Sequence, residues 1–418
     1  MTASVMTRGR PRSLAARAAL NRPSLGTRAR RRLTWTTMTA LRGGRITLTD
    51  PLGHRSFGDD RGPAGRVHVH DLRAYDRLIS GGGAGLGASY ADGLWSTDDL
   101  TAVLRVALRN TRRTHPLGNA WHALLAPVTD RIARARRRQS LEADAADIRA
   151  HYDLGNDFFE LVLDETMMYS AAYFADGGDD LAAASRAKLD LLNRLLDLQD
   201  GDRVLEIGTG WGGYAEHTAR NVPVSITTTT ISREQYLFAQ QRMRQAGLNH
   251  QVQVLDQDYR MLQGEFDKAV SIEMIEAVDW REYDTYFAAI AQRLRPGGRF
   301  AMQAIVIGDA DFDRAKRKSD FIKEYIFPGG CLPSVRALRA AAANHGLVLT
   351  AGNDLGLHYA ETLRRWRTNL HAAAANHPEV APLSDERFVR LWDFYFSYCE
   401  AGFTEGYITD KQLLFERR

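Results

Sequence analysis

The chain has 418 residues and a formal net charge of +4, and 44% of its residues are hydrophobic, which is ordinary for a globular protein. This length predicts two domains, and no apolar run approaches the length of a membrane span. The two cysteines, Cys331 and Cys399, offer neither a disulfide framework nor a metal-site spacing. We therefore expect no bound metal and a reducing, cytoplasmic setting.

Residues 1–40 form a basic segment in which arginines occur without any acid. Scattered proline and glycine without a hydrophobic period predict a disordered tail, and the apolar core of a signal peptide is missing. Met38 is an alternative start, in which case residues 1–37 would not belong to the protein. Further basic clusters occur at 131–138 and 314–318. Such charge attracts polyanions, and because no nucleic-acid motif is visible, we expect an anionic membrane surface and no nucleic acid.

Residues 41–120 are expected to form a small α+β domain, followed by a basic helical connector at residues 121–145. Short runs of alternating apolar residues predict its strands, and capping residues ahead of longer periodic runs predict its helices. The expected elements are strands at 45–49 and 66–70, a helix from Asp71 to Leu78, and a helix from about 96 toward Asn110. The run Gly81-Gly82-Gly83 is expected to end the first of these helices.

From residue 146 to residue 418, short apolar strands alternate with helical segments, which predicts an α/β domain with a mainly parallel sheet and helices on both faces. The expected strands are 203–207, 225–230, 252–256, 268–272 and 299–305. Ligands of such sheets bind beyond the carboxyl ends of the strands. The candidate site residues therefore follow the strands, at 208–212, 231–235, 257–259, 273–276 and 303–307.

The first of these strands ends in the glycine-rich turn Gly208-Thr209-Gly210-Trp211-Gly212-Gly213. Glycines reach positive φ angles and let bare backbone approach a ligand, and helix-start N–H groups favour electronegative atoms. The turn indicates a nucleotide-like cofactor, although a tight turn without a ligand would use the same glycines. Glu206 precedes the turn, and the strand at 225–230 ends without the acid that holds the ribose of NAD. Both observations favour S-adenosylmethionine over NAD.

Several longer motifs accompany this turn along the chain. They are His151-Tyr152-Asp153-Leu154-Gly155-Asn156-Asp157-Phe158-Phe159, Met168-Tyr169-Ser170, Thr230-Ile231-Ser232-Arg233-Glu234-Gln235, Asp258-Tyr259-Arg260, Tyr283–Phe287 and Tyr325–Ser334. Together with Leu205–Gly213, these motifs resemble the cyclopropane-fatty-acyl-phospholipid synthase family. The resemblance covers about residues 147–418 and extends more weakly to Gly85–Gly93.

The resemblance implies a Rossmann-like class I methyltransferase domain preceded by the small α+β domain. It implies transfer of a methyl group from S-adenosylmethionine to the double bond of an unsaturated acyl chain in a membrane phospholipid. The enzyme is then expected to be peripheral at the inner membrane surface and a homo-oligomer, most simply a dimer. The implied cofactor contacts are Tyr169, Ser170, Gly208, Gly210, Gly212, Thr230, Ile231, Gln235, Asp258 and Tyr259.

The resemblance also implies a base, because methyl transfer to an alkene creates a carbocation that must lose a proton. In the family a bound bicarbonate is thought to serve, held by a cysteine, a glutamate, a histidine and a tyrosine. Glu276 and Tyr359 match two of these positions, but Ala171 and Gln303 replace the cysteine and the histidine. This counts against bicarbonate. We expect Glu276, Tyr359 and Gln303 to be the catalytic residues, with Glu276 as the base or as a stabiliser of the cation.

The fate of the cation decides the product. Proton loss from the added methyl group closes a cyclopropane, whereas a hydride shift before that loss gives an exocyclic methylene, which a separate reductase could convert into a methyl branch. The altered base site leads us to hypothesise the methylene product. The alternatives are cyclopropane formation, methylation of a small soluble substrate such as an amine, and a lipid-binding relative that has lost catalysis.

Overall fold

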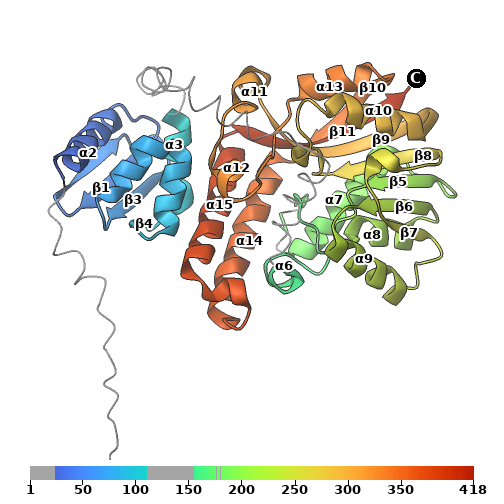
Figure 1. Ribbon diagram of the computed structural model, residues 1–418, viewed down its shortest axis with the longest axis horizontal. Helices are drawn as coiled ribbons and strands as arrows, with labels where there is room; N and C mark the ends of the chain where they lie inside the picture. Colours follow the sequence, from blue (N-terminus) through green and yellow to red (C-terminus); the bar gives the residue numbers. More distant parts are fainter. Residues whose placement is uncertain (1–23, 111–154, 176, 179) are drawn as a thin grey trace, which may run out of the picture.

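The computed structural model describes residues 24–110, 155–175, 177–178 and 180–418, which form a small N-terminal domain and a larger α/β domain (Figure 1). Several expectations fall outside these residues. They concern the first part of the tail (1–23), the connector at 121–145, the basic cluster at 131–138 and the start of the motif at 151–159.

A four-stranded sheet with the order β2-β1-β3-β4 forms the centre of the N-terminal domain. Its strands are β1 (Arg45–Asp50), β2 (Gly53–Gly58), β3 (Ala64–Val69) and β4 (Trp95–Thr97). Strand β1 pairs antiparallel with β2 and parallel with β3. The two expected strands and the helix toward Asn110 are confirmed, while β2 and β4 were not predicted.

One expectation for this part of the chain is wrong. The segment expected to be disordered contains helix α2 (Leu25–Met38), which tertiary contacts hold in place: the Arg31 side chain donates two hydrogen bonds to the buried Asp50. The expected break at the glycine run is confirmed. Gly82, with φ 53° and ψ −132°, is not helical and divides α3 (Arg73–Ala91) into two helical segments.

The α/β domain is built on a seven-stranded sheet with the order β10-β11-β9-β8-β5-β6-β7. Its strands are β5 (Arg203–Ile207), β6 (Ser225–Thr230), β7 (Val252–Asp256), β8 (Phe266–Ile272), β9 (Leu294–Ile307), β10 (Leu347–Asp354) and β11 (Ile408–Arg417). Strands β5, β6, β7, β8 and β9 run parallel to one another, and β11 is antiparallel to both β9 and β10. All five expected strands are confirmed, and β10 and β11 are additional.

Helices cover both faces of this sheet, as expected (Figure 1). Helices α7 (Leu181–Leu196) and α8 (Gly213–Asn221) share one core with Val204 of β5. Helices α10 (Tyr283–Arg293) and α13 (Val335–Ala343) share the other core with Leu205 and Ile207. Helix α9 (Arg233–Gln245) follows β6. Because both faces of β5 are buried, its residues are mostly apolar and do not alternate with polar ones. Glu206 is the charged residue among its buried positions.

A layer of helices joins the two domains (Figure 1). It contains α14 (Gly356–Asn376) and α15 (Glu386–Thr404), with the shorter α6 (Asn156–Val162), α11 (Asp309–Ala315) and α12 (Phe321–Tyr325) nearby. Gly87 of α3 packs closely against this layer, since a Cβ atom there would lie 2.4 Å from Phe321 and 2.8 Å from Phe394. The Tyr90 hydroxyl also donates to Asp393 at 2.6 Å. Of the helices in the described ranges, none is long and apolar enough to cross a membrane.

Candidate active site

A cavity of about 520 Å³ lies beyond the carboxyl ends of β5, β6, β7 and β8, where the sheet rule placed the site. Nine of the ten expected cofactor residues line it: Tyr169, Ser170, Gly208, Gly210, Thr230, Ile231, Gln235, Asp258 and Tyr259. The tenth, Gly212, is the N-cap of α8, and a Cβ atom there would meet Ala239 instead.

The glycine-rich turn forms one wall of the cavity. Gly208 and Gly210 have φ angles of 98° and 52°, which favour glycine. At Gly208 a Cβ atom would lie 3.2 Å from the side chain of Met274. A larger residue at this position would therefore crowd Met274, which also lines the cavity.

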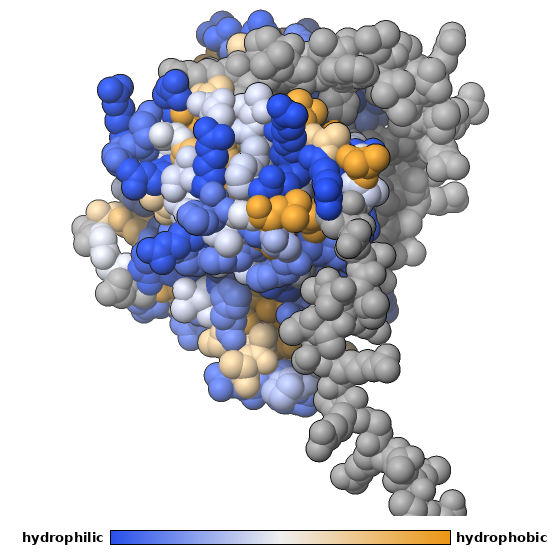
Figure 2. All heavy atoms as spheres, turned by 90° about the vertical axis from the view of Figure 1, so that its left-hand side faces the viewer, coloured by the Kyte–Doolittle hydropathy of each residue, from blue (hydrophilic) through white to orange (hydrophobic). Residues whose placement is uncertain are grey.

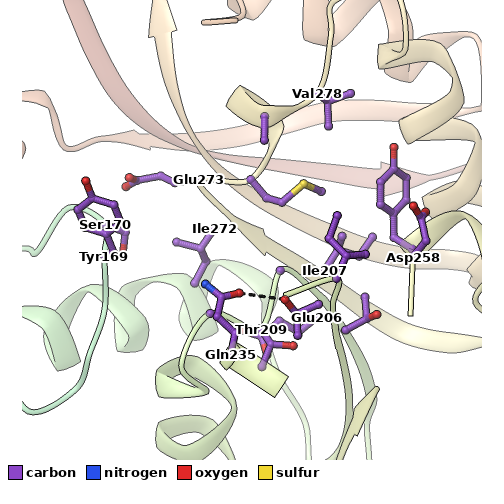
Figure 3. A pocket seen from close by; sticks show the side chains of 18 of the residues that line it. Tyr169, Ser170, Glu206, Ile207, Thr209, Gln235, Asp258, Ile272, Glu273 and Val278 are labelled. Atoms are coloured by element: carbon purple, nitrogen blue, oxygen red, sulfur yellow. Dashed lines mark hydrogen bonds between the residues drawn. The ribbon is translucent and has the colours of Figure 1, made fainter. Parts of the chain in front are cut away.

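Two polar groups on the neighbouring strands are fixed in orientation. The Thr230 hydroxyl donates to Gln235 Oε1 at 2.9 Å, which orients the Gln235 amide (Figure 3). Arg260 donates to both carboxylate oxygens of Asp258, at 2.9 and 2.8 Å. Burial opposes ionisation of Asp258, but the bonds from Arg260 outweigh it and hold its pKa below the usual value. Asp258 is thus a charged hydrogen-bond acceptor at the cavity wall.

Glu206 is an acid in a place that is costly for a charge. Its side chain is 2% exposed, and one carboxylate oxygen has no hydrogen-bond partner among the described residues. Burial raises the pKa of Glu206 to about 8. Since Glu206 also lines the cavity, a cationic group of a ligand would supply the missing partner.

Glu273 is the acid at the centre of the candidate catalytic site, and the sequence analysis did not single it out. Its Oε1 accepts hydrogen bonds from the Ala171 N–H at 2.9 Å and from Gln303 Nε2 at 2.8 Å. Its Oε2 accepts from the Tyr359 hydroxyl at 2.7 Å. Glu273 directly follows β8, has a φ angle of 48° and faces the cavity (Figure 3). Such strain in a residue other than glycine is typical of functional sites.

Opposing effects set the proton affinity of Glu273. Burial raises its pKa, whereas the hydrogen bonds from Tyr359, Ala171 and Gln303 and the charge of Lys188 lower it. Burial is the larger effect, so the pKa of Glu273 is raised above the usual value and its carboxylate is a stronger base than that of an exposed glutamate.

Gln303 is held by a chain of amides behind Glu273. Its Nε2 donates to Glu273 and also to Asp410 at 2.9 Å, and its Oε1 accepts from Gln412 at 3.2 Å. Asn353 donates in turn to Gln412 at 3.2 Å. Gln412 donates to the Gln303 amide oxygen, so this chain directs the Gln303 N–H group toward Glu273 and Asp410.

Glu276, the carboxylate that the sequence analysis favoured, lies elsewhere. It is not on the cavity wall, and its Oε1 accepts from the Ile305 N–H at 2.6 Å. Burial and the neighbouring Glu273 raise its pKa to about 8, so it is mainly neutral at pH 7. The expected trio is therefore only partly brought together: Gln303 and Tyr359 meet at Glu273, not at Glu276.

Known proteins share much of this sequence. A family model described as mycolic acid cyclopropane synthetase matches residues 139–413, which is more than half of the chain. The chain is 40% identical to tuberculostearic acid methyltransferase UfaA1 of Mycobacterium tuberculosis over 359 residues, covering 84% of this chain and 82% of that protein.

The chain belongs to the mycolic acid cyclopropane synthetase family.

Two further relatives agree. The cyclopropane-fatty-acyl-phospholipid synthase of Escherichia coli is 39% identical over 357 residues, covering 84% of this chain and 87% of that protein. The solved structure of the mycolic acid cyclopropane synthase CmaA1 complexed with SAH and CTAB matches with a TM-score of 0.60 and 30% identity, over 65% of this chain and 98% of that chain. The expected family, the class I methyltransferase fold and dependence on S-adenosylmethionine are thereby confirmed.

A cluster of aromatic rings reaches Glu273 through the hydroxyl of Tyr359. The Tyr169 ring lies 5.2 Å from Trp366 and 6.4 Å from Phe327 between centroids. Tyr359 lies 6.0 Å from Trp366 and stacks on Phe403 at 4.6 Å. Ring faces stabilise positive charge and exclude water, which a carbocation requires. Tyr325, the first residue of the motif Tyr325–Ser334, is 36% exposed, on the surface.

Proposed function

We propose that this enzyme methylates the double bond of an unsaturated acyl chain in a membrane phospholipid and releases a mid-chain exocyclic methylene. The observation that carries the proposal is the carboxylate of Glu273, anchored by Ala171, Gln303 and Tyr359. Sequence identity does not distinguish a methylene product from a cyclopropane product, because this chain is 40% identical to a methyltransferase and 39% identical to a cyclopropane synthase.

The cavity wall offers matching groups for each part of S-adenosylmethionine. Asp258 and Tyr259 would hold the adenine, and Gln235 the ribose. The unpartnered oxygen of Glu206 would accept a hydrogen bond from the cofactor's amino group. The cofactor supplies an electrophilic methyl group when bound. These contacts would direct the cofactor along the cavity toward Glu273, which lies at the other end from Asp258 (Figure 3).

Glu273 is proposed as the base in place of bicarbonate. Bicarbonate would require the hydrogen-bond donors of its cradle, and in this chain Ala171 N–H, Gln303 and Tyr359 already donate to the Glu273 carboxylate. Two ligands with the same charge and the same need for donors compete for one place. The enzyme therefore carries its own base, and we propose that it uses no bicarbonate.

A base fixed at three points also favours the methylene product. The aromatic rings of Tyr169, Tyr359 and Trp366 stabilise the cation during a hydride shift from the methylated carbon to its neighbour. Glu273 then accepts a proton from the added methyl group, and the C–H electron pair forms the carbon–carbon double bond. A separate reductase would be needed to convert this product into a methyl branch.

The test is incubation of the protein with S-adenosylmethionine and vesicles of an oleoyl phospholipid. Mass spectrometry of the methyl esters should show the gain of one CH2 unit. Because methylene and cyclopropane products are isomers, proton NMR must then show vinylidene protons. Ring protons alone would contradict the proposal, and binding of the cofactor without any product would favour a lipid-binding relative without catalysis.

We propose that the outer face of α2 docks the enzyme on an anionic membrane as a peripheral protein at the cytoplasmic surface. Leu25 and Leu33 are 85% and 55% exposed, and the exposed Arg28 and Arg32, which are one helical turn apart, lie between them in the sequence. Figure 2 shows hydrophobic residues interspersed with hydrophilic ones on this side of the molecule. Leucines that enter the interface beside arginines that meet lipid phosphates are typical of interfacial helices.

Vesicle sedimentation tests this surface. Replacing both Arg28 and Arg32 with glutamate should weaken binding to anionic vesicles, and wild-type binding should fall with rising salt. The control replaces Arg244 and Arg339, which are exposed on α9 and α13, with the same change of charge. Equal loss in both variants, or binding that salt does not change, would contradict the proposal. In the other basic cluster, Arg314 and Lys316 are already paired with acids.

A further inference from the structure

Lys188 is a buried cation next to the cavity that the proposed mechanism does not use. It lies on α7, its side chain is 0% exposed, and its Nζ donates to Ser170 Oγ at 2.7 Å. Ser170 lines the cavity and is itself only 2% exposed. A fully buried charge is costly unless something compensates for it. The hydroxyl of Ser170 connects this charge to the cavity wall.

The location of Ser170 decides which part of the cofactor it can meet. Tyr169 and Ser170 lie at the Glu273 end of the cavity, and Asp258 lies at the opposite end (Figure 3). If the adenine lies at Asp258 and the reacting methyl group faces Glu273, the amino-acid part of the cofactor extends toward Ser170. That part carries one ammonium and one carboxylate group.

Charge complementarity then indicates which residue binds the carboxylate group of the cofactor. Among the described residues that line the cavity, the cationic side chains are Arg260 and Arg281, which are bonded to Asp258 and Asp279. At the Ser170 end, Lys188 is the positive group that reaches the wall. Glu206 provides the matching acid for the ammonium group.

We propose that Lys188, acting through the Ser170 hydroxyl, binds the carboxylate of the methionine part of S-adenosylmethionine. The Ser170 hydroxyl accepts a hydrogen bond from the Lys188 side chain and donates its own hydrogen to the cofactor's carboxylate group. A hydroxyl polarised in this way is a stronger donor. Lys188 is thus a positioning residue for the cofactor. The inference rests on the cofactor assignment, and it does not depend on which product forms.

The surroundings of Lys188 give this interaction a pH dependence. The acids that face it are Glu273 after β8, Asp410 on β11, Asp164 after α6 and Glu206 on β5. Burial lowers the pKa of Lys188 to about 8, and these acids oppose the shift. A carboxylate at Ser170 would favour the charged lysine further. Glu206 ionises in the same pH range, and its contact with the ammonium group is common to ligands with and without a carboxylate. The affinity advantage of a ligand with a carboxylate over the same ligand without it should therefore fall as the pH rises above about 8.

Calorimetric titration with two ligands tests the proposal on the full chain. The ligands are S-adenosylhomocysteine and its decarboxylated analogue, which keeps the amine. Lys188→Met should weaken S-adenosylhomocysteine about 10- to 100-fold, which is the loss expected for a charge-assisted contact. It should change the affinity for the decarboxylated analogue by less than about 3-fold.

A matched control and a second variant separate binding from folding. Lys268→Met removes another buried lysine of this domain, which donates at 3.0 Å to the backbone oxygens of Leu196 and Asp197, and it should leave both affinities unchanged. Ser170→Ala should reproduce the ligand-selective loss without removing a buried charge. Equal losses for both ligands, no loss for either, or a wild-type ratio of the two affinities that does not change from about pH 7 to about pH 9, would overturn the proposal. A cyclopropane product would overturn only the proposed function.

Discussion

Replacing Glu273 with glutamine tests the assignment of the base. The amide has the shape of the carboxylate, so its oxygen can still accept hydrogen bonds from Ala171 and Gln303. Its nitrogen can donate to the Tyr359 oxygen, which reverses the hydrogen bond seen in the structure. The local fold should therefore be preserved, while the ability to accept a proton is lost.

The expected loss follows from the role of a positioned base. General-base catalysis contributes about 10²- to 10⁴-fold to a rate. Converted at about 1.4 kcal/mol for each factor of ten, the substitution should raise the barrier by about 3 to 5 kcal/mol. The affinity for S-adenosylhomocysteine should change little, because Glu273 is proposed to act on the substrate and not on the cofactor.

The assay is single-turnover conversion of an oleoyl phospholipid, with Glu276→Gln as the matched control. Glu276 is already mainly neutral at pH 7, and glutamine keeps the oxygen that accepts from Ile305, so the control should retain most of its activity. Full activity of Glu273→Gln, or a larger loss in Glu276→Gln, would refute the reasoning and return the role of the base to Glu276.

Three further predictions concern pH, stability and cofactor affinity. Because burial raises the pKa of Glu273 above 4.5, turnover should fall as the pH drops through that raised pKa, and a profile without this acid limb would count against an ionised base. Burial opposes ionisation of Asp393, but its hydrogen bonds hold its pKa at about 2. Asp393→Asn should therefore lower the free energy of unfolding at pH 7 by about 2 kcal/mol, measured by chemical denaturation. In the wild type this contribution should disappear as the pH falls from about 4 through about 2. Gly208→Val should weaken S-adenosylhomocysteine binding by at least about 10-fold, since its Cβ would crowd Met274 at a φ of 98°, whereas Gly247→Ala, in an open turn with φ 71°, should leave calorimetric affinity unchanged.

The sequence predicted the α/β domain well because its strands are buried on both faces. The expected strands at 203–207, 225–230 and 252–256 agree with β5, β6 and β7 to the residue. Strands β10 and β11 were missed because they lie at one side of the sheet and carry polar residues, such as Gln412, inside their sequence. In the N-terminal domain, helix α2 depends on distant partners such as Asp50, which a local pattern cannot reveal.

The cofactor cavity could be predicted because the residues after parallel strands meet at one edge of the sheet. The base could not be identified in the same way. Residues 273–276 were a candidate segment, but the resemblance directed attention to Glu276, and a local sequence pattern does not show which of two nearby acids faces a cavity. The left-handed backbone at Glu273 and its bonds to Gln303 and Tyr359 are three-dimensional facts.

The fate of deuterium on the substrate tests the central claim most directly. The substrate is an oleoyl phospholipid that carries deuterium on both carbons of its double bond, and the product is examined by deuterium and carbon NMR. Our account predicts that the hydride shift moves one deuterium to the neighbouring carbon. That carbon then bears both deuterium atoms and is bonded to the carbon that carries the unlabelled =CH2 group. A product with one deuterium on each of two cyclopropane ring carbons would contradict it.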